Sequence, residues 1–151
     1  MMVTQTNASA GHPATGETMT DHHHAIRFSE TFRAAKIALE ALPMGRDIAI
    51  SVSGGERPHI GAVAVAQPRP SLADPQKVSA TTSVIALLGH KEDMLARGLA
   101  ARVAAAIDGV AVVSCGIHYD GLSDDEIAAV SAIVGRLADR LLEVLGRPGS
   151  S

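Results

Sequence analysis

The stretch SDDEIAAVSAIVGRLADRLLEVLG, residues 123–146, carries the strongest local signal in the chain. Its first four residues form a capping box, in which a serine and a glutamate satisfy the free amides of a helix start. The acids also lie at the positive end of that helix. Apolar side chains then recur at helical spacing until Gly146 ends the run: Ile127, Val130, Val134, Leu137, Leu141 and Val144. The stretch predicts an amphipathic helix.

Two further elements are expected just upstream of this helix. The run Val110–Cys115 is apolar, has the length of a strand and is flanked by glycines. Before it, Glu92–Ile107 is rich in alanine and carries larger apolar residues at four-residue steps, Leu95, Leu99, Val103 and Ile107. This segment predicts a helix with a narrow face of small residues.

The first two-thirds of the chain favours strands. Residues 26–33 alternate between apolar and polar side chains, which is the period of a half-buried strand, and Ile37, Leu39 and Ala41 continue or pair with it. A type I turn is expected at Leu42-Pro43-Met44-Gly45, and a surface loop at residues 67–76, which contain three prolines. Further strands are expected at residues 48–53, 59–66 and 78–88. About five consecutive strands with short connections predict an antiparallel meander.

Together these elements predict an α+β fold, a mostly antiparallel sheet of about six strands with two helices packed on one face. We expect one domain over residues 26–146, because 151 residues and 15.5 kDa suit a single core. Residues 1–25 are expected to form a disordered tail, and residues 147–151 a short flexible C-terminus. The tail includes His22-His23-His24, which we interpret as a solvated run rather than a metal site, since a flexible run fixes no geometry.

Composition excludes several classes of function. The net charge is −3, and the chain has no Trp, one Tyr and two Phe, so both the charge and the stacking surfaces of nucleic-acid binding are missing. No apolar run reaches the roughly 18 residues of a membrane span, and the first residues lack the pattern of a secretory signal. The single cysteine, Cys115, excludes an internal disulfide and fits a reducing compartment. We therefore expect a cytoplasmic protein.

Three histidines, His59, His90 and His118, are the candidates for chemistry outside the tail. Each lies at an expected element boundary beside glycine or proline, which is where folds tend to place functional groups. For any one of them, a structural role in a cap or loop is the commoner explanation. For the three together, function and structure are equally supported, and a small metal-dependent enzyme is one alternative.

The segment Gly89-His90-Lys91-Glu92-Asp93 has the pattern of a glycine turn that opens a helix. Free amides at a helix start attract anions, and Lys91 adds a positive charge, so a phosphate site is a reasonable hypothesis. The glycine spacing matches neither a Walker loop nor a dinucleotide fingerprint. In the alternative interpretation, Glu92 and Asp93 merely offset the helix dipole.

The segment Gly116-Ile117-His118-Tyr119-Asp120-Gly121 places an imidazole, a phenol and a carboxylate in one loop. Such a group could serve acid–base chemistry or ligate a metal. However, no known hydrolase or metalloprotease motif accompanies it, and Cys115 in its apolar run is more typical of a small buried side chain than of a nucleophile. The residues alone therefore indicate a small ligand-binding protein and identify no reaction.

Three stretches together carry a resemblance to a known family: Pro58–Ala64, Gly89–Arg97, and Gly116–Asp120 followed by Asp124–Ile127. In order and spacing they resemble the prenylated-flavin chaperone-like family, the small accessory proteins of UbiD-like, non-oxidative hydroxyaryl acid decarboxylases. The resemblance extends from about Arg27 to Leu145. It implies a non-catalytic protein that binds reduced prenylated FMN as cargo and assists its delivery or maturation in the decarboxylase. The family also resembles the proteasome-assembly-chaperone fold, which usually dimerises, and we expect a homodimer.

The resemblance and the residues agree on where the flavin would bind. The phosphate would suit the turn at residues 89–91, the small-residue segment 60–65 would lie against the ring, and residues 118–120 would contact its edge. The predicted cofactor-binding residues are His59, Ile60, Gly61, Gly89, His90, Lys91, Gly116, His118, Tyr119 and Asp120. No catalytic or metal-binding residue is predicted. A second hypothesis is an assembly factor that binds the decarboxylase without contacting flavin.

Overall fold

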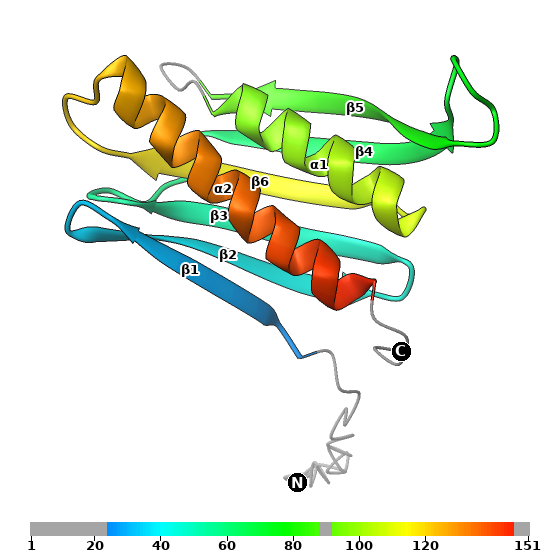
Figure 1. Ribbon diagram of the computed structural model, residues 1–151, viewed down its shortest axis with the longest axis horizontal. Helices are drawn as coiled ribbons and strands as arrows, with labels where there is room; N and C mark the ends of the chain where they lie inside the picture. The colour runs from blue at the N-terminus through cyan, green and yellow to red at the C-terminus, as the bar shows by residue number, and fades with distance from the viewer. Residues whose placement is uncertain (1–23, 88–91, 147–151) are drawn as a thin grey trace, which may run out of the picture.

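The computed structural model describes residues 24–87 and 92–146. It has the predicted α+β architecture, a six-stranded sheet with two helices on one face (Figure 1). The elements, in chain order, are β1 Ile26–Phe32, β2 Ala35–Met44, β3 Asp47–Gly55, β4 Ala62–Pro70, β5 Val78–Ala86, α1 Asp93–Ile107, β6 Ala111–His118 and α2 Asp124–Leu145. The expectations for residues 1–23, 88–91 and 147–151 lie outside the described residues.

The strand order is β1-β2-β3-β6-β4-β5, so the sheet is not the simple meander that the sequence predicted. The hairpins β1–β2, β2–β3 and β4–β5 are antiparallel, as expected. The strand β6, however, lies between β3 and β4 and runs parallel to β3. Its residues Ala111, Val113 and Cys115 are buried on the helix-covered face, whereas Val112 faces away and is 36% exposed. The sequence could not predict this insertion because neighbouring strands in the chain were assumed to pair.

Several strand boundaries also differ from the prediction. The strand β4 begins at Ala62 instead of residue 59, and β6 continues beyond Cys115 to His118, which was expected in a loop. The strand β2 continues through Pro43 to Met44, and the turn comes at Gly45, whose φ of 65° is in the left-handed region that glycine tolerates. The strand β4 extends through the proline-rich segment to Pro70 instead of ending at Ala66. Beyond Ala66 it pairs only with β5, since its ladder with β6 ends there. Prolines are tolerated at such a sheet edge, because one side of the strand donates no ladder hydrogen bonds.

The two helices divide the sheet between them. Helix α1 packs on β4, β5 and β6, and α2 packs on β1 and β2 (Figure 1). The helix-facing positions of the α1 half are small, and Ala62, Ala64 and Ala66 of β4 are fully buried there. The α2 half instead buries large side chains, among them Ile37, Leu39, Val52, Leu137 and Leu141. Within the described residues, no helix is long and apolar enough to cross a membrane.

The capping box predicted at the start of α2 is confirmed. The hydroxyl oxygen of Ser123 accepts a hydrogen bond from the Glu126 amide at 3.3 Å, and the Glu126 carboxylate accepts one from the Ser123 amide at 3.0 Å. Helix α1 starts differently. Its N-cap residue is Glu92, which makes no side-chain capping bond.

Candidate functional site

One end of the sheet gathers residues that are far apart in the sequence, and we call it the His corner: Arg57, His59, Ile60, Gly61, Glu92, Gly116, His118 and Asp120. Strands β3 and β6 both end here, at the paired residues Gly55 and His118. The chain then crosses the end of β6 to begin β4, and the Gly61 amide donates to the carbonyl of Cys115 at 2.9 Å. This crossing brings His59 within 6.3 Å of His118, measured between ring centroids. Two of the three predicted histidines are therefore neighbours.

The glycines of the His corner allow backbones to cross. A Cβ atom on Gly116 would overlap the carbonyl group of His59, and one on Gly55, whose φ is 79°, would overlap the carbonyl group of His118. Neither backbone segment can move aside, because both continue into the sheet. The sequence predicts Gly116 as a cofactor-binding residue. In the structure, Gly116 is required by the contact with residue 59 itself.

The imidazole of His59 lies between a carbonyl and a carboxylate. Its Nδ1 is 3.0 Å from the carbonyl oxygen of Arg57, so Nδ1 carries a proton and donates it. Its Nε2 is 3.4 Å from the carboxylate of Glu92, and both side chains are mostly buried. An ion pair there requires the second proton on the ring. Glu92 therefore faces the His corner, and its carboxylate also lies against Gly61, where an added Cβ would come within 2.5 Å of it.

A second polar group of the His corner joins Arg57, His118 and Asp120. Arg57 donates to the Asp120 carboxylate at 2.6 Å, and its guanidinium lies 2.7 Å from Nε2 of His118. The same Nε2 is 2.8 Å from the Asp120 carboxylate, so it either accepts from Arg57 or donates to Asp120, but not both at once. The hydrogen bond from His118 and the charge of Arg57 hold the pKa of Asp120 below its usual value. All three side chains reach solvent, and Arg57 and Asp120 are about two-thirds exposed.

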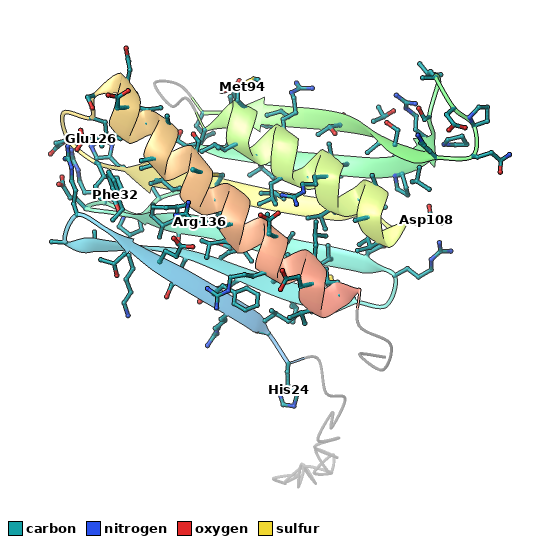
Figure 2. The ribbon with its side chains drawn as sticks, viewed as in Figure 1. His24, Phe32, Met94, Asp108, Glu126 and Arg136 are labelled. Carbon is teal, nitrogen blue, oxygen red and sulfur yellow. The ribbon has the colours of Figure 1, made fainter. Side chains whose placement is uncertain are left out.

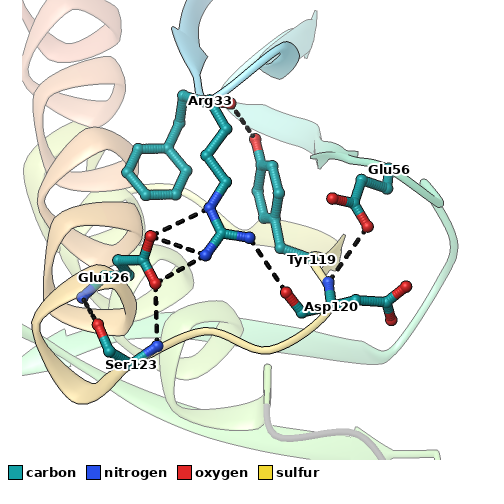
Figure 3. Close-up of polar contacts among 7 residues, drawn as sticks. Arg33, Glu56, Tyr119, Asp120, Ser123 and Glu126 are labelled. Atoms are coloured by element: carbon teal, nitrogen blue, oxygen red, sulfur yellow. Dashed lines mark hydrogen bonds and ion pairs between the residues drawn. The ribbon is translucent and has the colours of Figure 1, made fainter.

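The loop that follows His118 is anchored from two sides (Figure 3). Arg33 donates to the carbonyl of Asp120 at 3.0 Å, and the carboxylate of Glu56 accepts from the Asp120 amide at 3.2 Å. The same guanidinium makes a forked contact with the carboxylate of Glu126, with two hydrogen bonds of 2.7 Å and one of 3.0 Å. The capping box of α2 is thus tied to the β1–β2 turn and to the loop that carries Asp120.

Tyr119 has a structural role that the sequence did not predict. Its ring is 6% exposed and packs edge-on against Phe32, with centroids 5.3 Å apart. Its hydroxyl lies within hydrogen-bonding distance of two carbonyl oxygens, those of Phe32 at 3.2 Å and Ala35 at 3.3 Å. The side chain points into the core, towards β1, rather than into the His corner (Figure 3). Burial also raises the pKa of this phenol.

The remaining predicted residues are placed in part. Ile60 is 58% exposed and offers an apolar surface beside the two histidines. Gly89, His90 and Lys91 lie outside the described residues. The described neighbours on either side of them both contact Gly61, through the amide of Leu87 at 2.8 Å and through the Glu92 carboxylate. Cys115 is buried, which raises the pKa of its thiol to about 12 and confirms that it is a packing residue.

Sequence reasoning missed Arg33, Glu56 and Arg57. Only Arg57 had a local signal, since it stands two residues before His59 in a polar break between strands. The partners of Arg33 and Glu56 are 64 to 93 residues away in the sequence, so no spacing rule connects them.

The His corner is an open polar surface in the described residues. Hollows of about 400, 390 and 190 Å³ lie elsewhere: at the opposite end of the sheet, on the sheet face away from the helices, and between α1 and α2. None of these three is lined by His59 or His118. Within residues 24–87 and 92–146, no group of three or more His, Cys, Asp or Glu side chains could hold a metal ion.

Fold and site together define a small α+β protein with a polar corner at one end of its sheet. Residues 31–146 match the model of the prenylated flavin chaperone LpdD-like domain, and the chain therefore belongs to this family. Among solved structures, it is similar to a chain of a chaperone complex for yeast 20S proteasome assembly, at 17% identity and a TM-score of 0.50. That similarity covers 81% of this chain and 98% of the other, and it shows a common fold. No curated protein matches the chain.

Proposed function

We propose that this protein binds reduced prenylated FMN at the His corner and delivers it to a UbiD-like decarboxylase in the cytoplasm, without catalysing a reaction itself. The family match supports the ligand class. The observation that carries the location is the meeting of His59, His118 and Glu92, since they come from the three stretches that resemble the family.

The donors and surfaces of the His corner suit the parts of a flavin nucleotide. Arg57 is exposed and positively charged, and an arginine fork matches the geometry of phosphate. The exposed side chain of Ile60 gives an apolar contact for a ring, and the imidazole of His118 can hydrogen-bond to its polar edge. Lys91, which the sequence places beside the start of α1, would add a second cation for the phosphate.

An open site also suits a carrier. A cargo that must pass to another protein has to leave, so part of it must remain accessible while it is bound. Arg57, Asp120 and Ile60 all face solvent. The decarboxylase would then approach from the same side.

The test is an anaerobic titration of reduced prenylated FMN and of its dephosphorylated analogue. Loss of a charge-assisted hydrogen bond costs about 1.5–3 kcal/mol, so Lys91→Ala should weaken binding of the phosphorylated ligand by roughly 10- to 100-fold. Binding of the analogue should hardly change in this variant. His118→Ala should weaken both ligands if the imidazole contacts the ring.

Lys77→Ala is the matched control, because Lys77 pairs with Asp74 in the loop between β4 and β5, away from the His corner. It should leave both affinities unchanged. Equal losses of affinity for both ligands in Lys91→Ala would show that the phosphate does not bind at residues 89–91. If neither Lys91→Ala nor His118→Ala changes binding, the location at the His corner is wrong.

An assembly factor that binds the decarboxylase without flavin is the second candidate. The observation in its favour is that the three hollows described above lie outside the His corner. The two candidates differ in one measurement. A carrier should transfer flavin to the apo-decarboxylase and restore its absorbance, whereas an assembly factor should form the complex and transfer none.

A further inference from the structure

A groove runs between α1 and α2, and we call it the helix groove (Figure 1). Its lining comes from the two helices alone and includes exposed positions of α1, so it opens to solvent and not towards the sheet. Its middle is a hollow of about 190 Å³ that is lined chiefly by small and apolar residues: Met94, Leu95, Gly98, Val134, Gly135 and Ala138.

Two of these lining residues are glycines that the chain itself does not require. A Cβ atom on Gly98 or Gly135 would meet no atom within 4 Å. At Gly116 and most other described glycines, by contrast, a Cβ would overlap a neighbouring segment or the backbone has a positive φ. Glycine in the middle of a helix weakens that helix relative to alanine. Packing within the chain therefore does not explain either glycine, whereas the close approach of another molecule would.

Large apolar side chains are exposed where the helix groove opens towards the His corner. Met94, in the first turn of α1, is 70% exposed. Ile127, in the first turn of α2, is 50% exposed, and its carbonyl accepts a hydrogen bond at 3.0 Å from Ser131, which lines the hollow one turn later. Glu92, the residue of the His corner that faces His59, comes two residues before Met94. The helix groove therefore adjoins the proposed flavin site.

The charges around the helix groove favour a cationic partner. The first turns of the two helices carry Asp93, Asp124 and Asp125, and they contain no Lys or Arg. Further along α1, Arg102 also lines the hollow, but it is paired with Asp139 of α2. The open end of the helix groove is therefore acidic among the described residues.

We propose that an apolar helix of the UbiD-like decarboxylase, flanked by Lys or Arg side chains, docks in the helix groove. This inference rests on the proposed function, which makes the decarboxylase the protein that receives the flavin. The enzyme has to contact the rim of the flavin site to take the cargo, and the helix groove adjoins that rim. The ends of this chain fit less well as occupants. Residues 1–23 contain no Lys or Arg, and residues 147–151 follow the end of α2 that lies away from the His corner.

The size of the helix groove suits a short-lived contact. From Met94 to Arg102, α1 rises about 12 Å at about 1.5 Å per residue, which is the length of about two turns of a docked helix. A helix in such a groove presents apolar side chains at three- and four-residue spacing. Interfaces that bury less than about 1,200 Å² are typical of transient encounters. A carrier that delivers its cargo and then leaves needs a contact of this kind.

The test measures binding of the full chain to the purified apo-decarboxylase by isothermal titration calorimetry. Gly98→Gln and Gly135→Gln each extend a side chain from a position where a Cβ has open space, so both variants should fold. Both should bind the enzyme at least about tenfold more weakly, because the new side chain occupies the hollow. Met94→Gln should also weaken binding, since it replaces an exposed apolar side chain with a polar one.

Ala132→Gln is the matched control, because Ala132 is exposed on α2 and does not line the hollow. This variant should bind the enzyme as the wild type does. Circular dichroism and chemical unfolding check that every variant is folded. Raising the NaCl concentration should weaken the wild-type complex, because the acidic helix starts attract the cations of the partner. An affinity that does not fall with salt would overturn the cationic character of the partner.

A flavin titration of the same proteins separates this inference from the proposed function. Gly98→Gln should bind reduced prenylated FMN as the wild type does, because neither His59 nor His118 lines the hollow. Glycine variants that bind the apo-decarboxylase normally, or a wild-type chain that binds flavin but not the enzyme, would overturn docking in the helix groove and leave the flavin site in place. If the glycine variants lose the enzyme while the wild type binds no flavin, the docking surface is supported and the carrier function is wrong.

Discussion

Helices α1 and α2 begin at the same end of the sheet but are held there in different ways (Figure 2). At the start of α2, Glu126 completes the capping box and binds Arg33, so the carboxylate serves the local structure. At the start of α1, Glu92 makes no capping bond and instead faces His59. The comparison indicates that a helix start with every local bond in place is structural. The start of α1 belongs to the candidate site, because its Glu92 side chain lies beside the imidazole of His59 and makes no cap.

Disrupting the backbone crossing at Gly116, beside the start of α1, should cause the largest loss of stability. Gly116→Ala would place a methyl group in the carbonyl of His59, and the backbone there cannot yield. We expect a loss of at least about 3 kcal/mol in the free energy of unfolding, measured by chemical denaturation. Gly135→Ala adds the same methyl group to α2, where no atom lies within 4 Å. That control should gain about 0.5–1 kcal/mol, as alanine is the better helix former. A Gly116→Ala variant of normal stability would refute the crossing.

A more moderate change compares the two helix starts directly. Ser123→Ala removes the cap of α2 and should cost about 1 kcal/mol of unfolding free energy. Glu92→Gln keeps the shape of the α1 start and loses no side-chain cap, so its cost should be smaller and should come from the contact with His59. Thermal and urea unfolding of both variants measure the difference. Equal losses would show that the cap of α2 stabilises the protein no more than the contact between Glu92 and His59.

The smallest expected effect is a loss of stability in acid. The hydrogen bonds from Arg33, followed by those within the cap, lower the pKa of Glu126 below its ordinary value of 4.5. A carboxylate with a lowered folded-state pKa stabilises the fold above its unfolded pKa, and this contribution is lost as the pH falls through the folded value. The free energy of unfolding should therefore decrease on acidification below about pH 5. Glu126→Gln should flatten this acid limb, while Asp125→Asn, in the same turn, should leave the Arg33 contribution in place. An unchanged slope in Glu126→Gln would contradict the interpretation.

Local patterns were enough for much of the fold. The capping box at Ser123 and the alternation in β1 to β3 depend on neighbours a few residues apart, and both are confirmed. Local patterns did not predict the order of the strands. The strand β6 lies between β3 and β4, although it comes last of the six strands in the chain. A sequence pattern records which residues are apolar, but not which strand lies beside which.

The candidate site, like the fold, was predictable from the sequence only in part. His59 and His118 stood out because each adjoins a glycine or proline at a strand end, which is visible in the sequence. Their contact with each other, and the contacts of His59 with Glu92 and of Asp120 with Arg57, join residues 33 to 63 positions apart. Tyr119 was assigned to the ligand from its position beside His118. Its direction into the core follows from its packing against Phe32, which only the folded chain brings near.

Spacing along the chain was sufficient to predict the α+β class, the helix that begins at Ser123 and the family resemblance. The folded chain was needed to reveal the insertion of β6, the meeting of His59 with His118 and the packing of Tyr119 against Phe32. These last features depend on backbone crossings and side-chain contacts between residues that are distant in the sequence. These contacts contribute energy only once the sheet has formed, so no local sequence pattern can predict them.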